Sequence, residues 1–281
     1  IQNANPNEII LIGGKGHEEQ QIYKNKIFNI SDKKIVKKIK IKNISKEKRN
    51  YIHNNFLLEK VIGKIKPINF NGLSIDSRLI KKNNLFVTIK GKKNNGQKFI
   101  FDALKKGAGC VVTSYKFRKS NKKIIKVNNP FSFLNQFAKL KRDHSSSKII
   151  AITGSAGKTS LKELIKDLLQ NFAKTHSSPR SYNNQLGVPI SLSNLSLEDK
   201  FGVFEVGMSK AGEIRNLTKL IKPEIGIITN VGEAHIENFK NINGIAKAKS
   251  EIIENIQPGG TIILNRDDKF FNYFSNKAKK Y

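Results

Sequence analysis

The sequence predicts an α/β protein made of a small α/β domain followed by a doubly wound, mostly parallel sheet that carries a phosphate-binding loop. Three observations support this fold class. Short apolar runs alternate with amphipathic helical segments from about residue 56 onward. TGSAGKTS, at residues 153–160, follows an apolar run and opens a helical segment, as a phosphate loop requires. A chain of 281 residues is long enough for about two domains with cores of their own.

The first 42 residues are too few to bury a core of their own. They contain a strand-like run at Glu8–Ile12, the glycine cluster IGGKGHEE, a second extended piece (KIFNIS) and a helix that Ser31 or Asp32 could cap. The polar, charged stretch Asn43–Asn54 has the composition of a linker. We therefore expect a segment at 1–42, a linker at 43–55, a small domain at 56–146 and a phosphate-loop domain at 147–281.

The small domain is expected to alternate strands and helices. LFVTI, GCVVT and KIIKVNN are strand-like, QKFIFDALKKG is an amphipathic helix that ends at a glycine, and a further helix runs from about Pro130 to Arg142. HSSSK, at residues 144–148, is a plausible hinge to the next domain.

The second domain begins with the apolar run KIIAIT and a helix from about Lys158 to Phe172. FGVFEVG, EIGIITNVG and GGTIILN are short apolar runs typical of strands buried on both faces. Helices near 211–221 and 242–256 separate them, so this domain is expected to hold a parallel sheet that is incomplete at Tyr281.

Composition narrows the class of protein. The formal net charge is +30, but the lysines are dispersed and accompany an excess of isoleucine and asparagine. The densest basic stretch, Ser31–Asn50, lacks interleaved aromatic residues that could stack on bases, so we expect no nucleic-acid partner. A nucleic-acid-dependent phosphate-loop ATPase remains an alternative at this point, and its affinity would fall steeply with salt.

Other global features indicate a cytoplasmic protein. No run approaches the roughly 20 apolar residues of a membrane span. The single cysteine, Cys110, lies in an apolar run, which excludes disulfides within the chain and suits a reduced compartment. Residue 1 is isoleucine and the only methionine is Met208, so we expect the sequence to be a piece of a longer protein.

The phosphate loop carries the most specific chemistry. Its glycines let backbone N–H groups approach phosphate oxygens, and the start of the following helix adds positive potential. Lys158 would reach the β- and γ-phosphates, and the Thr159 hydroxyl would ligate Mg²⁺. Ile152 stands where the longer G-x-x-x-x-G-K-[ST] pattern has its first glycine, so this is the shorter G-x-x-G-K-T loop. The expected nucleotide-binding residues are Gly154, Ser155, Ala156, Gly157, Lys158, Thr159 and Ser160.

Three further side chains belong to the same expected site. Glu205 ends the run FGVFE, at the carboxyl edge where open α/β sheets bind ligands, and a carboxylate there suits Mg²⁺. His235 follows the next apolar run, and Lys247 and Lys249 lie on the helical segment after it. Alone, such a histidine is more often structural and such lysines are usually solvated.

The order of the motifs decides the interpretation. TGSAGKTS, YNNQLGVP, EVGMSKAGEI, TNVGEAHIENF, AKAKSEI and ILNRDD together resemble the Mur ligases of peptidoglycan synthesis. LSIDSRLIKKNNLFVTIKG resembles the uridine-nucleotide-binding domain of the same family. The resemblance covers roughly residues 56–281. It is strongest to the branch that joins D-alanyl-D-alanine to UDP-N-acetylmuramoyl-tripeptide. Two places depart from the pattern: Asn95 and Gln97 replace an acid and a histidine, and Arg180 and Ser181 replace a glycine-asparagine pair.

The resemblance implies ATP and Mg²⁺ as cofactors and gives roles to particular residues. The implied catalytic residues are Lys158, Glu205, His235 and Lys249, with Lys249 carbamylated, and the implied magnesium ligands are Thr159, Glu205, His235 and Lys249. Asn265 and Asp267 would approach the adenine, and Ser74, Asp76, Ser77, Arg78, Asn183 and Asn184 would bind the substrate. ATP would phosphorylate the substrate's terminal carboxylate, and an amine would attack the resulting acyl phosphate to form an amide.

The first segment resembles a different part of the same family. IILIGGKGHEEQQIYKNKIFNISDKKIVKK is similar to the extreme C-terminus of the branch that adds the third amino acid of the stem peptide. In that branch Gly14 and Glu18 match positions that contact the incoming diamino acid. A fusion of two Mur ligases is the economical explanation, and adjacent reading frames joined by error are the alternative. The family's amine-binding C-terminal domain is expected to be absent after Tyr281, so the piece could bind ATP and the uridine nucleotide without ligating.

Overall fold

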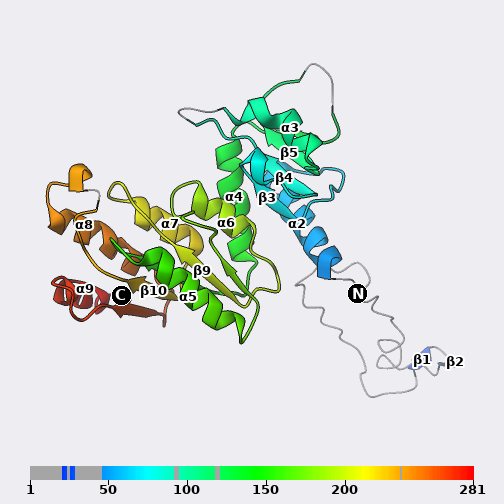
Figure 1. Cartoon of the computed structure of the whole chain (residues 1–281). Coiled ribbons are helices and arrows are strands. Elements are labelled where there is room, and N and C mark those ends of the chain that lie inside the picture. Colours follow the sequence, from blue (N-terminus) through cyan, green and yellow to red (C-terminus); the bar gives the residue numbers. More distant parts are fainter. Residues whose placement is uncertain (1–20, 24–25, 29–45, 92–94, 118–120, 235) are drawn as a thin grey trace. The chain divides into compact units, whose positions relative to one another are not determined.

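The structure is a computed structural model, and it describes residues 21–23, 26–28, 46–91, 95–117, 121–234 and 236–281 (Figure 1). The chain divides into two units, residues 1–56 and residues 57–281. In the first unit, strands β1 (Gln21–Tyr23) and β2 (Lys26–Phe28) pair antiparallel, and β2 agrees with the extended piece expected at KIFNIS. The strand expected at Glu8–Ile12 and the helix expected after Ser31 lie outside the described residues.

The expected linker is largely helical, which the sequence analysis did not anticipate. Helix α2 spans Lys46–Ile62 and takes in most of residues 43–55. Its polar composition masked three pairs of apolar residues in which the two members are four positions apart and so share a side of the helix. These pairs are Ile52 with Phe56, Leu57 with Val61, and Leu58 with Ile62. Leu57 and Leu58 are fully buried, so apolar side chains of this helix take part in the packing of the core.

The small domain contains a four-stranded parallel sheet in the order β3-β4-β5-β6. Its strands are β3 (Gly72–Ser74), β4 (Asn84–Val87), β5 (Cys110–Thr113) and β6 (Ile124–Lys126). Its helices are α3 (Ile100–Lys105) and α4 (Pro130–Asp143). The helix expected over QKFIFDALKKG begins as a 3₁₀ turn at Gly96–Phe99, continues as α3, and is followed by Gly107 with a φ of +96°. Cys110 is fully buried, as expected for a core residue, and burial raises the pKa of its thiol to about 12.

The second domain contains a five-stranded parallel sheet in the order β11-β10-β7-β9-β8. The strands are β7 (Lys148–Thr153), β8 (Thr175–Ser177), β9 (Phe201–Glu205), β10 (Ile225–Ile228) and β11 (Thr261–Leu264). The chain winds from β7 to β8 and β9 on one side, and then crosses to β10 and β11 on the other. The carboxyl end of β7 is therefore a topological switch point, where open α/β sheets bind ligands.

Helices cover both faces of this sheet. The helices are α5 (Lys158–Gln170), α6 (Gly187–Ser193), α7 (Glu213–Ile221), α8 (Ile242–Lys249) and α9 (Phe271–Ala278). On one face, Ile150, Ile152 and Val203 pack against the inner side of α5. On the other face, Ile149 and Phe204 join a larger core with α6, α7 and α8. Alternate residues of β7 thus enter opposite cores, which explains why its sequence is apolar throughout.

The apolar runs located most of the sheet strands correctly, but several elements escaped the sequence analysis. Strands β3 and β8 have only three residues each, and α6 and α9 are short, so none of them shows a full period of apolar residues. The run at β11 was expected to be buried on both faces, but β11 pairs with β10 alone among the described strands, and Ile263 is 49% exposed. The helix expected at 242–256 ends as an α-helix at Lys249 and continues as a 3₁₀ turn to Asn255.

Candidate functional site

The phosphate loop joins β7 to α5 at the switch point of the sheet. Gly154 has a φ of +151°, and a Cβ there would lie 1.8 Å from the Thr229 hydroxyl oxygen, so only glycine fits. The Lys158 ammonium donates to the carbonyls of Gly154 at 2.7 Å and Ser155 at 3.2 Å. Burial lowers the pKa of Lys158, and the nearby Glu205 carboxylate opposes that shift. The structure thus holds this lysine against its own loop, at the start of α5.

Glu205 is buried at the carboxyl end of β9, with 1% of its surface exposed. One carboxylate oxygen accepts from the Thr159 hydroxyl at 2.7 Å, and the other accepts from the Asn183 side-chain amide at 2.7 Å. No lysine or arginine of the described ranges forms an ion pair with this carboxylate. A buried carboxylate beside a hydroxyl is a hard-oxygen donor set of the kind that Mg²⁺ prefers, so the residues present fit Mg²⁺.

The two asparagines of YNNQLGVP lie on the loop between β8 and α6. Asn183 contacts Glu205 through its side chain, and its carbonyl accepts from the Gly207 N–H at 2.7 Å. Asn184 is a capping residue, because its side-chain oxygen accepts from the N–H groups of Leu186 at 3.0 Å and Gly187 at 2.9 Å. Of this pair, Asn183 therefore orients the candidate metal carboxylate, and Asn184 fixes the start of α6.

A buried lysine that the sequence analysis missed holds the same loop. Lys162, on α5, is fully buried, and its ammonium donates to the carbonyls of Ser178 at 2.7 Å and Arg180 at 2.6 Å. Arg180, which replaces the family's glycine, has a φ of +50°, a conformation that glycine adopts at lower cost. The only sequence signal for Lys162 was its position one turn after Lys158 on the phosphate-loop helix.

Lys249 is the last residue of α8 and is 3% exposed, whereas Lys247 is exposed. Burial lowers the pKa of Lys249 to about 7, and the charge of Lys158 adds to that shift. The described residues offer its ammonium no hydrogen bond or ion pair. The structure therefore separates two lysines that the sequence could not distinguish.

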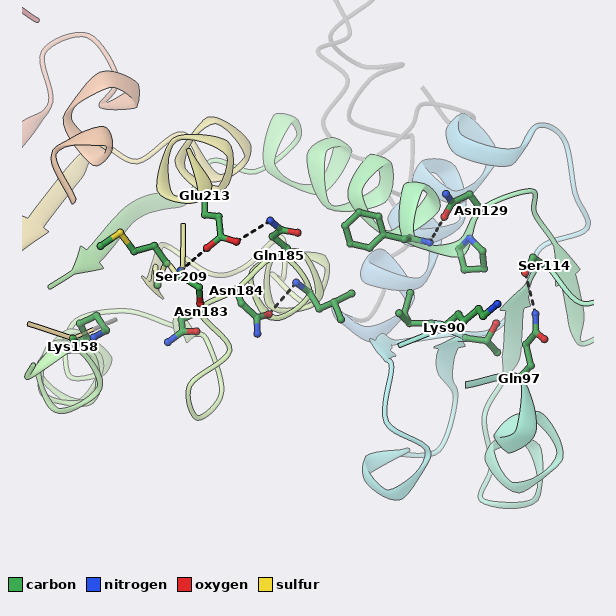
Figure 2. A pocket seen from close by; sticks show the side chains of 18 of the residues that line it. Lys90, Gln97, Ser114, Asn129, Lys158, Asn183, Asn184, Gln185, Ser209 and Glu213 are labelled. Carbon is green, nitrogen blue, oxygen red and sulfur yellow. Dashed lines mark hydrogen bonds between the residues drawn. The ribbon is translucent and has the colours of Figure 1, made fainter. Parts of the chain in front are cut away.

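One cavity of about 940 Å³ connects this site with the small domain. Gly154, Lys158, Asn183 and Lys249 line one side of it, and Figure 2 labels Lys158 and Asn183 on that side. The opposite wall belongs to the small domain and contains Lys90, Gln97, Ser114 and Asn129.

Polar contacts fix both walls of the cavity. On the small-domain side, the Gln97 side chain donates to the Ser114 hydroxyl at 3.1 Å, and Asn129 caps α4 at the Phe131 N–H. On the other side, Glu213 accepts from the Ser209 N–H at 2.6 Å and from Gln185 at 3.3 Å. The sequence analysis did not select Lys90, Ser114, Asn129, Gln185 or Glu213, because nothing in the sequence shows that these segments face the phosphate loop.

The expected substrate residues of the small domain lie at a second, neighbouring cavity of about 480 Å³. Asp76, Ser77 and Arg78 line it together with Asn184, which lines both cavities, and Ser74 lines neither. Asp76 accepts from the Arg78 guanidinium at 2.7 Å, and this hydrogen bond is the main reason that the pKa of Asp76 is lowered. The Ser74 hydroxyl donates to the Asp76 carbonyl at 3.0 Å, and this bond stabilises the turn of the chain at residues 74–76.

Other expected residues are not in the cavities or are not described. Asn265 and Asp267 follow β11 at the carboxyl edge of the sheet and are exposed, with the Asn265 side chain accepting from the Asp267 N–H at 3.1 Å. His235, Gly14 and Glu18 lie outside the described residues. Within the described ranges, no cluster of three His, Cys, Asp or Glu side chains could hold a metal ion.

Two family models match this chain. The Mur ligase middle domain matches residues 152–281, and the Mur ligase family catalytic domain matches residues 69–142. The chain belongs to the Mur ligase family. Its α/β fold with two parallel sheets is the Mur ligase fold. The matched regions include the phosphate loop, Glu205 and the small-domain wall of the cavity.

Relatives of known function place this Mur ligase chain beside the MurF branch. It is 40% identical over 206 residues to the UDP-N-acetylmuramoyl-tripeptide--D-alanyl-D-alanine ligase of Rickettsia prowazekii, covering 73% of this chain and 46% of the relative. It is 39% identical over 223 residues to the ligase of the same name from Buchnera aphidicola of Acyrthosiphon pisum, covering 75% of this chain and 49% of the relative. The chain thus spans about half the length of these relatives.

Solved structures agree with this placement. MurF from Acinetobacter baumannii superposes with a TM-score of 0.71 at 28% identity, over 80% of this chain and 51% of that one. MurF ligase from Thermotoga maritima in complex with ADP superposes with a TM-score of 0.65 at 28% identity, over 77% and 50% of the two chains.

Among the described helices of this Mur ligase chain, none combines the length and hydropathy needed for a transmembrane span.

Proposed function

We propose that this chain is the nucleotide- and substrate-binding part of a MurF-type ligase that joins D-alanyl-D-alanine to UDP-N-acetylmuramoyl-tripeptide at the expense of ATP. The observation that carries the proposal is the shared cavity. Gly154 and Lys158 of the phosphate loop line one side of it, together with Asn183, whose side chain contacts Glu205, and the small domain forms the other side. A carboxylate held by the small domain would therefore meet the γ-phosphate of ATP.

The residues of this chain hold the nucleotide and the metal. Lys158 and the first N–H groups of α5 bind the phosphates, because the start of a helix has unpaired N–H groups and a positive dipole. Thr159 and Glu205 hold Mg²⁺, together with His235 and a carbamylated Lys249. When bound, Mg²⁺ supplies positive charge that stabilises the phosphoryl group during its transfer. Asn183 keeps Glu205 in its orientation.

Lys249 suits carbamylation because of its burial. A pKa of about 7 leaves much of the amine neutral at neutral pH, and only the neutral amine can attack CO₂. The product is a carbamate, which has the negative charge and oxygen donors of a carboxylate. That change removes one buried positive charge beside Lys158.

The reaction proceeds in two balanced steps. An oxygen of the tripeptide's terminal carboxylate attacks the γ-phosphorus and ADP leaves, which yields an acyl phosphate. The amine of D-alanyl-D-alanine then attacks the carbonyl carbon, phosphate leaves and the amine loses a proton. Ser74, Asp76, Ser77, Arg78, Asn183 and Asn184 are the residues that we assign to the UDP-linked substrate, and Asn265 and Asp267 are those that we assign to the adenine. We place the reaction in the cytoplasm.

We also propose that residues 1–42 are the C-terminal remnant of a MurE-type ligase fused to the MurF-type part. Gly14 and Glu18 would contact a diamino acid in that domain. The small domain then occupies 56–146 and the phosphate-loop domain 147–281. An uninterrupted reading frame in genomic DNA across residues 43–54, with complete ligase halves on both sides, supports the fusion; a frame break there contradicts it.

Phosphate release from ATP by the full-length parent protein tests the activity. We expect release only when UDP-N-acetylmuramoyl-tripeptide and D-alanyl-D-alanine are both present. Lys158→Ala should abolish release, whereas Lys166→Ala, two turns along the same helix and outside the cavity, should not. Equal turnover with nucleic acid alone, or full activity of Lys158→Ala, would overturn the proposal.

A further inference from the structure

The short phosphate loop is held by a second segment, residues 229–232, which follows β10. The Thr229 hydroxyl donates to the Ala156 carbonyl at 2.7 Å. The Asn230 side chain bonds Ala156 in both directions, accepting from its N–H at 2.9 Å and donating to its carbonyl at 3.3 Å. The Ser155 N–H donates to the Asn230 carbonyl at 3.0 Å. Ser155 is thus hydrogen-bonded to the backbone of this segment, and Ala156 to its side chains.

A further pair of contacts closes this segment onto the loop. The Ser155 hydroxyl donates to the Gly232 carbonyl at 3.0 Å and accepts from the Gly232 N–H at 2.8 Å. Thr229 also lies so close to Gly154 that any side chain at residue 154 would collide with its hydroxyl. Each loop residue from 154 to 156 therefore makes a close contact or a hydrogen bond with residues 229–232.

The same segment reaches the other end of the expected nucleotide site. The Val231 N–H donates to the Asp268 carboxylate at 2.7 Å, and the second oxygen of Asp268 accepts from the Phe270 N–H at 2.8 Å. Asp268 follows Asn265 and Asp267, the residues that we assign to the adenine. Residues 229–232 are thus bonded to the phosphate loop on one side and to the adenine-side segment on the other.

We propose that residues 229–232 are a brace that sets the shape of the phosphate loop before nucleotide binds, with Thr229 and Asp268 as positioning residues. This inference rests on the proposed function, because it concerns the same nucleotide site. The brace uses the N–H groups of Ser155 and Ala156, and leaves those of Lys158 and Thr159, at the start of α5, for phosphate. A loop with glycines at 154 and 157 would otherwise lose more conformational entropy when it closes on the ligand.

Binding of Mg²⁺-ADP to the 281-residue chain, measured by calorimetry, tests the brace. Thr229→Val keeps the shape of the side chain and removes its hydroxyl. Because one neutral hydrogen bond is lost, we expect the Kd to rise about 3- to 10-fold. Thr229→Ser keeps the hydroxyl and should stay within about twofold of the unmodified chain. Asp268→Ala, which removes the acceptor of the Val231 N–H, should raise the Kd by a similar factor.

Thr218→Val is the matched control. Its buried hydroxyl donates to the Ile214 carbonyl within α7, so its loss should lower the melting temperature and leave the Kd for Mg²⁺-ADP unchanged. If Thr229→Val and Asp268→Ala both bind Mg²⁺-ADP within about twofold of the unmodified chain, while Lys158→Ala does not bind, the brace is refuted and the proposed function stands. Failure of the unmodified chain to bind Mg²⁺-ADP would overturn both.

Discussion

His176 makes the stability of the second domain depend on pH. It lies on β8, the strand that leads into the loop of Asn183 and Asn184, where its ring packs 5.8 Å from Phe204 and contacts the Ser191 hydroxyl at 3.0 Å. Burial lowers its pKa from 6.5 to about 4. A hydrogen bond with Ser191 opposes that shift, and the charges of Lys141 and Lys174 add to it. The folded domain therefore favours the neutral imidazole.

The sign and size of the effect follow from these two pKa values. Above pH 6.5 the imidazole is neutral in both the folded and the unfolded chain, so its contribution to stability is complete. As the pH falls from 6.5 towards 4, the unfolded chain binds a proton that the folded chain does not, and stability is lost. Between pH 7.5 and 5.0 the loss is about 2 kcal/mol, from 1.36 kcal/mol per unit over roughly 1.5 units.

Urea unfolding at pH 7.5 and 5.0, for the unmodified chain and for His176→Gln, measures this term. Glutamine keeps a hydrogen-bonding group for Ser191 but does not titrate. We expect the unmodified chain to lose about 2 kcal/mol more than the variant between the two pH values. Equal losses in the two proteins would refute the reasoning, because they would mean that the folded domain accepts a proton on His176 as readily as the unfolded chain does.

Two further substitutions test the site. Glu205→Gln keeps the shape of the buried side chain but removes its charge. It should weaken Mg²⁺-dependent binding of ADP at least about tenfold, the cost of one charge-assisted contact, without lowering the melting temperature of the ligand-free chain; calorimetry and thermal unfolding measure the two effects. Lys162→Met should cost about 2–4 kcal/mol of unfolding free energy in urea, because the buried Ser178 carbonyl and the partly buried Arg180 carbonyl lose their donor. Lys166→Met, one turn further along the same helix, removes a partly exposed ion pair with Glu163 and should cost less than about 1 kcal/mol.

The fold could be predicted from the sequence wherever apolar spacing was long and regular. Strands β7, β9 and β10 and the helix α5 appear as expected, because each buries a continuous apolar run. Helix α2 was not anticipated within the expected linker, because its composition is polar. Polar composition does not exclude burial, because His53, Asn54 and Asn55 of this helix are buried together with Leu57 and Leu58.

The candidate site could be predicted only in part, for a different reason. Lys158, Thr159 and Glu205 follow from the ends of strands, because parallel strands bring their carboxyl ends to one edge of a sheet. Lys162 and Thr229 could not be selected, because their partners are backbone carbonyls of segments far away in the sequence. Lys249 could be distinguished from Lys247 only once the structure showed which of the two is buried.

Transfer of oxygen from substrate to phosphate tests the central claim most directly. The full-length parent protein would be given ATP, D-alanyl-D-alanine and UDP-N-acetylmuramoyl-tripeptide labelled with ¹⁸O in its terminal carboxylate. Because the carboxylate oxygen that attacks the γ-phosphorus stays with phosphate when the amine displaces it, we predict one ¹⁸O atom in each phosphate released. Amide formation with unlabelled phosphate would contradict the account, because the carboxylate would then not have been activated by ATP in this cavity.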